Sequence, residues 1–284
     1  MTMQVNSNEL RQRVRDLAAM PQVVHEVLAA MRDAGVSIDA VAARVGHDPA
    51  LVARTLRVAN SPFYGLAGRI GSIRDALRVV GLRRLGTVLM AASVSDCFPP
   101  PACRGFVFKS FWGHSFATAI CAQALAAACH LDEGSAFTAG LLHDIGRLVL
   151  ATYYPRQLEA AIADAQLRDV APLDGERAVL ALDHCEVGAW VAAHWHFADV
   201  VVDAIGHHHE PPPRDAAAAP TLGDLIHVAD GIAHALDLTR EPDEMVPPMA
   251  LGAWTRLGLQ PEAFLTVFTH TELASAAFSE TLAI

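Results

Sequence analysis

Apolar residues recur at three- and four-residue intervals over residues 8–95, which is the pattern of amphipathic helices. The alternating pattern typical of strands is not convincing anywhere in this region. The segment VVHEVLAAMRDAG is expected to form one helix, Ser37 to cap the next, and residues 49–60 to form a third. Asp48 precedes a proline, as an N-cap residue does when proline occupies the first helical position. The pattern therefore predicts a bundle of short helices.

Helix-breaking residues divide this region from the rest of the chain. Ser72, with an aspartate three residues later, predicts the start of another helix, which is either one long helix or two joined at Gly81. Three consecutive prolines at 99–101 cannot continue a helix. We therefore expect a boundary there, with one lobe over residues 8–98 and a second over residues 105–284.

The second lobe shows the same helical period over longer segments. Helices are expected near residues 107–129, 133–150, 155–168, 184–195, 198–208, 221–236, 248–258 and 261–280. Gly140 and Gly146 are expected to interrupt the second of these helices. The whole chain is thus predicted to be all-α.

Composition and charge narrow the class of protein. Hydrophobic residues make up 52% of the chain and charged residues 18%, which indicates a helix-rich globular protein. A net charge of −10 opposes tight binding to nucleic acid, because lysines and arginines must neutralise the phosphates. We expect no nucleic-acid partner. A local concentration of arginines is interpreted as a solvated helix face: Arg69, Arg74, Arg78, Arg83 and Arg84.

The cysteines and the apolar segments bear on localisation. The five cysteines are odd in number and form no C-x-x-C pair, so neither a disulfide framework nor a zinc knuckle is indicated. The chain starts without an apolar segment of signal-peptide length. The best candidate for a membrane-spanning helix, residues 110–131, is interrupted by His114 and His130. We expect a cytoplasmic protein with no membrane partner.

Seven residues of the second lobe are candidate metal ligands. They come from separate segments, each at or near a predicted helix: His114, His143, Asp144, His184, His208, His209 and Asp230. Imidazole nitrogens and carboxylate oxygens suit divalent iron, manganese, zinc or magnesium, and sets rich in histidine favour the transition metals. One or two ions of Fe, Mn or Zn are therefore the expected cofactor.

The adjacent pair His143-Asp144 is the centre of this set. It lies in the apolar run AFTAGLLHDIGRLVL, where a buried aspartate is costly unless a cation or hydrogen-bond donors compensate it. Neighbouring residues at a helix end project about 100° apart, close enough to reach one ion. The alternative is a structural hydrogen bond between the two side chains that orients the core.

The segment AGLLHDIGRLVL resembles the signature of the HD superfamily of metal-dependent phosphohydrolases. The resemblance implies a first metal held by His114 in WGHS, the pair His143-Asp144, and Asp230 in HVADGIA. Members with two metals add a histidine that opens a later helix and a His-His doublet, which are similar to His184 in LDHCEVGAW and to His208-His209 in GHHHEPPP.

The chain departs from the superfamily in three places. The GYP element of the cyclic-di-GMP phosphodiesterase branch is missing, since EPPPRDAAAAP follows the histidines. Arg147 stands where a lysine usually follows HDIG, and Ser110 stands where some three-metal members have an acidic residue. The missing element puts cyclic-dinucleotide cleavage in doubt.

The run HDPALVARTLRVANSPFYG, with the segments on either side of it, resembles the HDOD family. DPAL, ANS, WGHS, GLLHDIG, DHCEVGAW and HHHE occur in that family's order, over roughly residues 8–240. The resemblance implies an N-terminal helical bundle followed by an HD-type helical domain. It also implies a bacterial signalling or regulatory protein without established catalysis.

Other polar residues have simpler interpretations. The second His-Asp pair, His47-Asp48, is explained by helix capping, and Asn60 by side-chain bonds to the backbone that stop a helix. His207 is expected to be exposed or packed, and neither His227 nor His234 has the expected position of a ligand. The sequence contains no convincing serine or cysteine nucleophile motif and no phosphate-binding glycine loop, which disfavours covalent catalysis.

Three functions remain open. The favoured hypothesis is a regulatory protein that acts through a protein partner in a signalling pathway, with a metal-competent site and no catalysis. The alternative is an active phosphohydrolase or phosphodiesterase that acts on a nucleotide or cyclic dinucleotide, in which Asp144 bridges the ions and Arg147 contacts a phosphate-containing ligand. The third is a metal that only stabilises the fold or senses metal or redox state.

Overall fold

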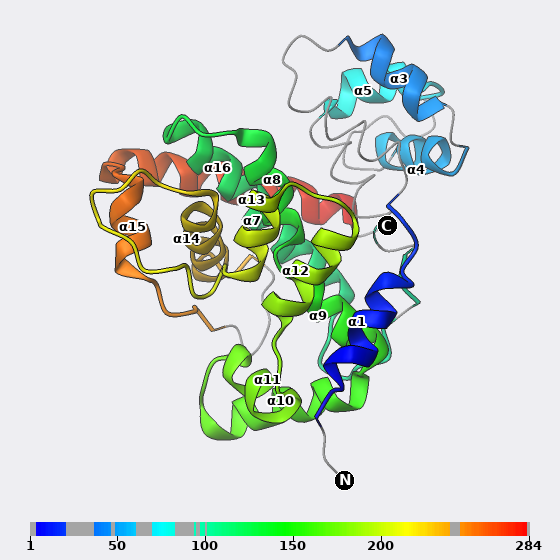
Figure 1. Cartoon of the computed structure of the whole chain (residues 1–284). Coiled ribbons are helices and arrows are strands. Elements are labelled where there is room, and N and C mark those ends of the chain that lie inside the picture. Colours follow the sequence, from blue (N-terminus) through cyan, green and yellow to red (C-terminus); the bar gives the residue numbers. More distant parts are fainter. Residues whose placement is uncertain are drawn as a thin grey trace. The chain divides into compact units, whose positions relative to one another are not determined.

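The computed structural model of the chain describes residues 4–20, 37–46, 49–60, 70–82, 94, 97–99, 101–238 and 245–282. Every regular element within these ranges is a helix (Figure 1). This confirms the expected all-α class. Over the same ranges, no helix combines the length and the hydropathy needed to cross a bilayer, including the segment near residues 110–131.

The chain folds into two compact units. One, the small unit, contains residues 18–97 and 276–284; the other, the site unit, contains residues 1–17 and 98–275. These bounds differ from the expected lobes at both ends of the chain, because the N-terminal helix belongs to the site unit and residues 276–284 belong to the small unit. Residues 21–36, with the expected helix VVHEVLAAMRDAG, lie outside the described residues, as does Asp48.

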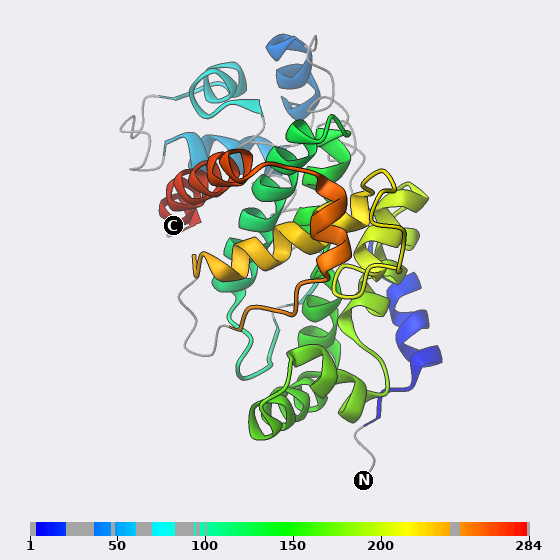
Figure 2. The same cartoon turned by 90° about the vertical axis from the view of Figure 1, so that its left-hand side faces the viewer.

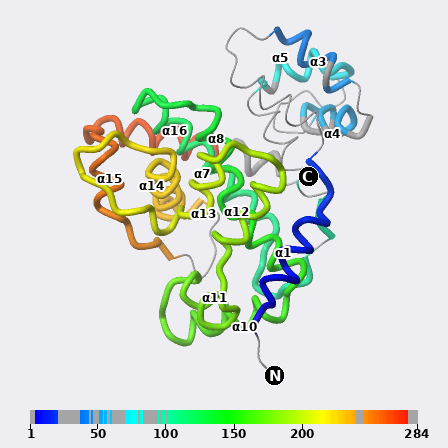
Figure 3. Tube along the Cα trace, in the orientation of Figure 1, coloured from blue at the N-terminus to red at the C-terminus, as the bar shows by residue number. Residues whose placement is uncertain are grey.

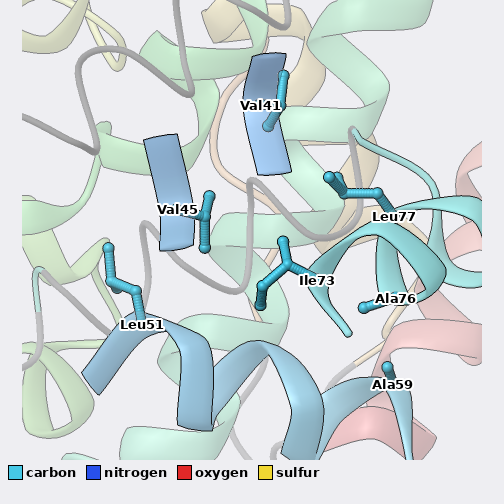
Figure 4. Packing of buried hydrophobic residues seen from close by; sticks show 7 residues of the cluster. All are labelled: Val41, Val45, Leu51, Ala59, Ile73, Ala76 and Leu77. Carbon is cyan, nitrogen blue, oxygen red and sulfur yellow. The ribbon is translucent and has the colours of Figure 1, made fainter. Parts of the chain in front are cut away.

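Three helices in the described part of the small unit surround one apolar core: α3 (Ile38–Gly46), α4 (Pro49–Ala59) and α5 (Ile73–Val80). Apolar side chains from all three meet in the interior (Figure 4): Val41, Val45, Leu51, Ala59, Ile73, Ala76 and Leu77. The helical spacing of these residues explains why each helix hides one face.

The ends of α4 and α5 follow the sequence signals. The Ser72 hydroxyl accepts from the Asp75 amide at 3.1 Å and caps α5, and Gly81 ends that helix with a φ of 84°. The Asn60 side chain donates to the Ile70 carbonyl at 2.7 Å and accepts from the Ile70 amide at 2.9 Å. Asn60 therefore stops α4 through backbone bonds, as expected.

Two of the five arginines of the expected basic face lie within the described residues. Arg74 pairs with Asp39 at 2.6 Å and Arg78 approaches Asp75 at 3.7 Å, with all four side chains at least half exposed. This agrees with a solvated face. Arg69, Arg83 and Arg84 lie outside the described residues.

The other described helices lie wholly or largely in the site unit. In chain order they are α1 (Ser7–Arg15), α7 (Phe108–Ala128), α8 (Glu133–Leu142), α9 (Ile145–Tyr153), α10 (Pro155–Arg168), α11 (Pro172–Leu180), α12 (His184–His194), α13 (Asp199–Gly206), α14 (Leu222–Ala235), α15 (Leu251–Leu257) and α16 (Pro261–Leu282). Of these, α11 was not expected from the sequence; it lies beside α10 (Figure 3). The last residues of α16 fall in the small unit.

Helix α7 is the centre of the site unit. It is buried on nearly every side, from Phe111 to Ala126, as a helix that is apolar all round requires. Helices α8 and α14 pack against it (Figure 2). Large side chains such as Trp112 and Phe116 are almost completely enclosed there.

The segment expected as one helix over residues 133–150 is two helices. Its break falls at His143-Asp144 and not at Gly140 or Gly146, because Asp144 adopts φ −95° and ψ 9°, outside regular helical geometry. The two glycines serve close packing instead. A Cβ on Gly146 would lie 2.7 Å from the Gly188 amide nitrogen of α12, and a Cβ on Gly140 would lie 2.7 Å from a backbone atom of α7.

Helix α1 and the residues on either side of it contact α11 and α12 of the site unit. The Arg11 guanidinium lies 3.8 Å from the centre of the Trp190 ring, and the Val5 amide donates to the Leu180 carbonyl at 3.1 Å. His194, at the end of α12, bonds the Leu17 carbonyl at 3.1 Å. These contacts explain why α1 lies with the site unit.

A buried ion pair fixes the start of α14 to α15. Asp224 and Arg256 are 1% and 3% exposed, and the Arg256 Nε lies 3.0 Å from the Asp224 Oδ2. The same carboxylate accepts from the Thr221 amide at 2.9 Å, which completes a capping box. Burial opposes ionisation of Asp224, but bonds from Arg256 and Thr221 hold the pKa of this carboxyl below its usual value.

We expect Asp224→Asn to lower the free energy of unfolding at pH 7 by about 3 kcal/mol, since Arg256 would keep a buried charge without its partner. Because the folded pKa of Asp224 lies below the unfolded value, the carboxylate stabilises the protein above about pH 4. That contribution is lost as the pH falls through the folded pKa. Denaturant unfolding of both proteins should therefore show a difference that shrinks below about pH 4.

The matched control is Glu272→Gln on α16, where the side chain is exposed. It should change stability by less than about 0.5 kcal/mol. An Asp224→Asn difference that stayed constant from neutral to strongly acidic pH would contradict the assigned role of this carboxylate.

Candidate metal centre

The seven candidate ligands come together in the interior of the site unit. His114 lies on α7, His143 and Asp144 lie at the junction of α8 and α9, and Asp230 lies on α14. The remaining three are His184, the first residue of α12, and the doublet His208-His209 that follows α13. Six of the seven are buried, and His209 is partly exposed.

One side of the cluster forms around Asp230. Its Oδ1 lies 3.0 Å from the His114 Nε2 and 3.4 Å from the His143 Nε2. The two histidine nitrogens are 3.2 Å apart. One carboxylate oxygen and two ring nitrogens thus face a single point.

The other side forms around Asp144. Its Oδ1 lies 3.3 Å from the His184 Nε2 and 3.7 Å from the His208 Nε2. The same oxygen is 3.8 Å from the His143 Nε2, so Asp144 connects the two sides. His209 closes the group, with its Nε2 3.1 Å from the His184 Nε2.

Backbone carbonyls orient two of these rings. The Nδ1 of His143 donates to the Gly140 carbonyl at 2.7 Å, and the Nδ1 of His208 donates to the Ile205 carbonyl at 2.8 Å. A proton on Nδ1 leaves the lone pair of a neutral ring on Nε2, which faces the cluster. This is the arrangement by which metal-binding histidines are usually held.

A buried carboxylate orients a third ring. Glu176 of α11 is 2% exposed, and its Oε2 accepts from both the His184 amide at 2.8 Å and the His184 Nδ1 at 2.7 Å. Glu176 is not among the residues expected at the site, because no helix was expected over residues 172–180. Only packing of α11 against the start of α12 brings this carboxylate to the ring.

The two aspartates carry buried negative charge. Burial alone would raise the pKa of Asp144, but His143, Arg147 and His184 hold that pKa well below its usual value. Burial likewise opposes ionisation of Asp230, and nearby histidines hold the pKa of its carboxyl well below the usual range. Buried carboxylates that stay ionised need positive charge beside them.

The histidines respond to this environment in different ways. Burial, together with His234, lowers the pKa of His114 to about 4, and burial beside His208 lowers the pKa of His209. By contrast, Cys185 and Asp144 overcome the effect of burial and raise the pKa of His208 to about 10. The neutral ring is the form that binds metal, and burial favours this form at His114 and His209.

One oxygen of the cluster has no hydrogen bond. The Asp230 Oδ2 is buried without a hydrogen-bond partner, and the His209 Nδ1 lies 3.6 Å from it. A buried carboxylate oxygen left in this way is costly. The unpaired oxygen and the surrounding imidazole nitrogens fit a divalent transition metal by position and by chemistry.

Two residues that were not expected to be ligands, His234 and Cys185, also lie at the cluster. The His234 Nε2 lies 3.4 Å from the Asp230 Oδ1, and its ring lies 4.3 Å from the ring of His114. The sequence does not give His234 the expected position of a ligand, and the structure places its ring beside the cluster. Its spacing of four residues from Asp230 on one helix is the signal for this position. Cys185 is the second, with its Sγ 3.8 Å from the His208 Nε2.

The remaining histidines have structural positions. His227 donates from Nδ1 to the His208 carbonyl at 2.7 Å and accepts from the Ala250 amide at 2.7 Å, so both ring nitrogens are used outside the cluster. His207 is exposed, as expected. The pair at residues 47–48 lies outside the described residues.

A cavity of about 180 Å³ leads to the cluster from outside. Its wall includes Asp144, His184, His209 and His234, with Arg147 beside them. The Arg147 side chain is 32% exposed and donates to the Asp144 Oδ2 at 3.0 Å. Arg147 therefore occupies the oxygen of Asp144 that does not face the histidines.

Known proteins share this architecture. The family model described as HDOD domain matches residues 17–211. A solved structure from Shewanella amazonensis, whose name assigns it provisionally to the phosphohydrolases, is 28% identical, with a TM-score of 0.66 over 96% of each chain. An HDOD domain protein of unknown function from Geobacter sulfurreducens is 23% identical, with a TM-score of 0.65 over 98% of this chain and 97% of the other.

A curated relative has the same segment within a longer chain. An uncharacterized protein of Treponema pallidum is 26% identical over 200 residues, which is 69% of this chain. The match spans 38% of that relative's length. A solved structure from Marinobacter aquaeolei is 21% identical, with a TM-score of 0.75. The match covers 95% of the present chain and 60% of the Marinobacter chain.

We expect Glu176→Gln to weaken metal binding by about 10- to 100-fold, the usual loss when a partner that orients a ligand is changed. Glutamine keeps the volume of the side chain but removes the charge that holds the His184 ring. Competition titration with Zn²⁺ measures the change, and circular dichroism establishes that the variant is folded.

Glu186→Gln is the matched control. Glu186 lies on the same helix as His184, and its half-exposed side chain pairs with Arg11 at 3.7 Å. It should leave the affinity unchanged. Equal Zn²⁺ affinity in the Glu176 variant and this control would show that Glu176 does not orient a ligand.

Proposed function

Because the chain belongs to the HDOD domain family, we propose that it is a bacterial signalling protein that acts by binding a protein partner. We further propose that its site unit holds one or two divalent transition-metal ions without catalysis. The ligands in this proposal are His114, His143, Asp144, His184, His208, His209 and Asp230. We place the protein in the cytoplasm and expect neither nucleic acid nor membrane among its partners.

The size of the cavity is the observation that carries the regulatory proposal. Pockets for nucleotide-sized molecules usually measure about 300–1,000 Å³. The cavity over the cluster measures about 180 Å³ in the described part of the chain, which suits a small anion better than a dinucleotide. Arg147 also occupies one oxygen of Asp144, which limits that carboxylate as a bridge between ions.

A bound ion would supply the positive charge that the two buried aspartates require. In the proposed arrangement, His114, His143 and Asp230 hold the first ion, and His184, His208 and His209 hold a second. Asp144 lies between them. These residues come from α7, α12 and α14, from the junction of α8 and α9, and from the end of α13, so metal binding would join six helices of the site unit.

A phosphohydrolase is the second candidate. It is favoured by the position of Arg147, whose guanidinium lines the cavity next to Asp144 and could contact a phosphate-containing ligand. When bound, a metal ion lowers the pKa of a water molecule enough for attack on phosphorus near neutral pH. The relative from Shewanella amazonensis with a provisional phosphohydrolase name supports this candidate.

Metal analysis combined with an activity assay separates the two candidates. Protein purified without chelator is expected to retain about one or two equivalents of Fe, Mn or Zn. With Mn²⁺ or Fe²⁺ added, it is expected to show no turnover of cyclic dinucleotides, nucleotides or simple phosphodiesters. Metal-dependent turnover that is lost in Asp144→Asn would establish the phosphohydrolase instead.

The partner is tested separately. A pull-down from the native host, with the full chain as bait, should recover one reproducible protein. Recovery of none across repeated experiments would count against the regulatory proposal, whatever the metal analysis shows.

A further inference from the structure

Cys185 extends the cluster beyond the histidines and aspartates. It is the second residue of α12, directly after His184, and its side chain is 4% exposed. Its Sγ lies 3.8 Å from the His208 Nε2. The same nitrogen of His208 lies 3.7 Å from the Asp144 Oδ1, so the thiol and the carboxylate approach one ring atom.

Four side chains share this part of the cluster. One donor atom from each of His184, Cys185, His208 and His209 lies within 4.8 Å of the donor atoms of the other three. Four donors at such separations can contact one ion after small rotations, since Zn–N bonds are about 2.0–2.1 Å and Zn–S bonds about 2.3 Å. Histidine nitrogen and cysteine sulfur are both common zinc ligands, and four of them satisfy a tetrahedral ion.

We propose that Cys185 is a thiolate ligand, and that His184, Cys185, His208 and His209 form a site for a soft divalent ion such as Zn²⁺. The inference rests on the proposed metal centre and adds to it a donor of a different chemical class. Thiolate sulfur prefers zinc over magnesium and manganese, which bind oxygen ligands better. The second position of the centre would therefore select zinc.

The first position of the centre has a different donor set. His114, His143, Asp144 and Asp230 offer only nitrogen and oxygen, which suit Fe²⁺ and Mn²⁺ as well as zinc. The two halves of the cluster thus differ in chemistry. A protein loaded with mixed metals would place zinc at the sulfur-containing half.

A separate cavity gives an ion a path to this half. It measures about 330 Å³, and its wall contains Cys185 and His209. Arg177 and Glu210 form part of the same wall and pair with each other at 2.7 Å. Two of the four proposed donors, Cys185 and His209, therefore line a cavity whose wall does not include Arg147.

The alternative is that the Cys185 thiol only forms a hydrogen bond with His208 and binds no metal. A sulfur 3.8 Å from a ring nitrogen also fits a weak hydrogen bond that orients His208. Such a bond needs no metal and leaves no sulfur on an ion. Spectroscopy of the metal itself distinguishes the two.

Cobalt substitution is the first test. The full chain loaded with Co²⁺ should show the near-ultraviolet absorption band of a cobalt–thiolate bond, and Cys185→Ser should lose that band. Zn²⁺ affinity should fall by at least about tenfold in the same variant, while Mn²⁺ affinity changes little. Cys129→Ser is the control, because the Cys129 Sγ lies near the Leu257 carbonyl and not at the cluster, so its band should persist.

The unmodified protein supplies a second test that does not depend on a folded variant. X-ray absorption of the zinc-loaded chain should show one sulfur at about 2.3 Å from the ion. Retained cobalt or zinc without sulfur would overturn the thiolate proposal and leave the metal centre standing. A chain that retains no metal would overturn both.

Discussion

The burial of Asp144 and Asp230 in one apolar interior is the constraint on which the site unit depends. Both carboxylates are nearly inaccessible, at 3% and 1% exposure, and both lie among histidine rings. Charge buried in this way is strongly destabilising unless a positive charge compensates it. Arg147 compensates one oxygen of Asp144, whereas the Asp230 Oδ2 has no hydrogen-bond partner.

Most of the metal-donor side chains around these carboxylates lie at the ends of helices. The chain breaks its helix at His143-Asp144, opens α12 with His184, and places the doublet His208-His209 directly after α13. Close approach of α9 and α12 requires Gly146, which explains why glycine follows so soon after Asp144. The carbonyls of Gly140 and Ile205 and the carboxylate of Glu176 then orient the rings.

Much of this could be predicted from the sequence, because it is encoded by local patterns. Apolar spacing and capping residues such as Ser72 predict most helices, and the His-Asp pair within an apolar run marks the site. The positions that could not be predicted depend on how separate helices pack against one another. Glu176 contacts the His184 ring from α11, which was not expected. Cys185 contacts His208 because α12 packs on α13. Helix α1 joins the site unit through the contact of Arg11 with Trp190.

The need for a cation at the centre is tested most directly by thermal unfolding of the chelator-treated chain with and without Zn²⁺ or Mn²⁺. At about 100 times the dissociation constant, a metal bound only by the folded state adds roughly 2.7 kcal/mol of stability. For a unit of this size that corresponds to a rise in Tm of about 5–10 °C. Asp230→Ala should remove most of the rise. A Tm of the unmodified chain that is the same with metal and with chelator would contradict a metal at this centre.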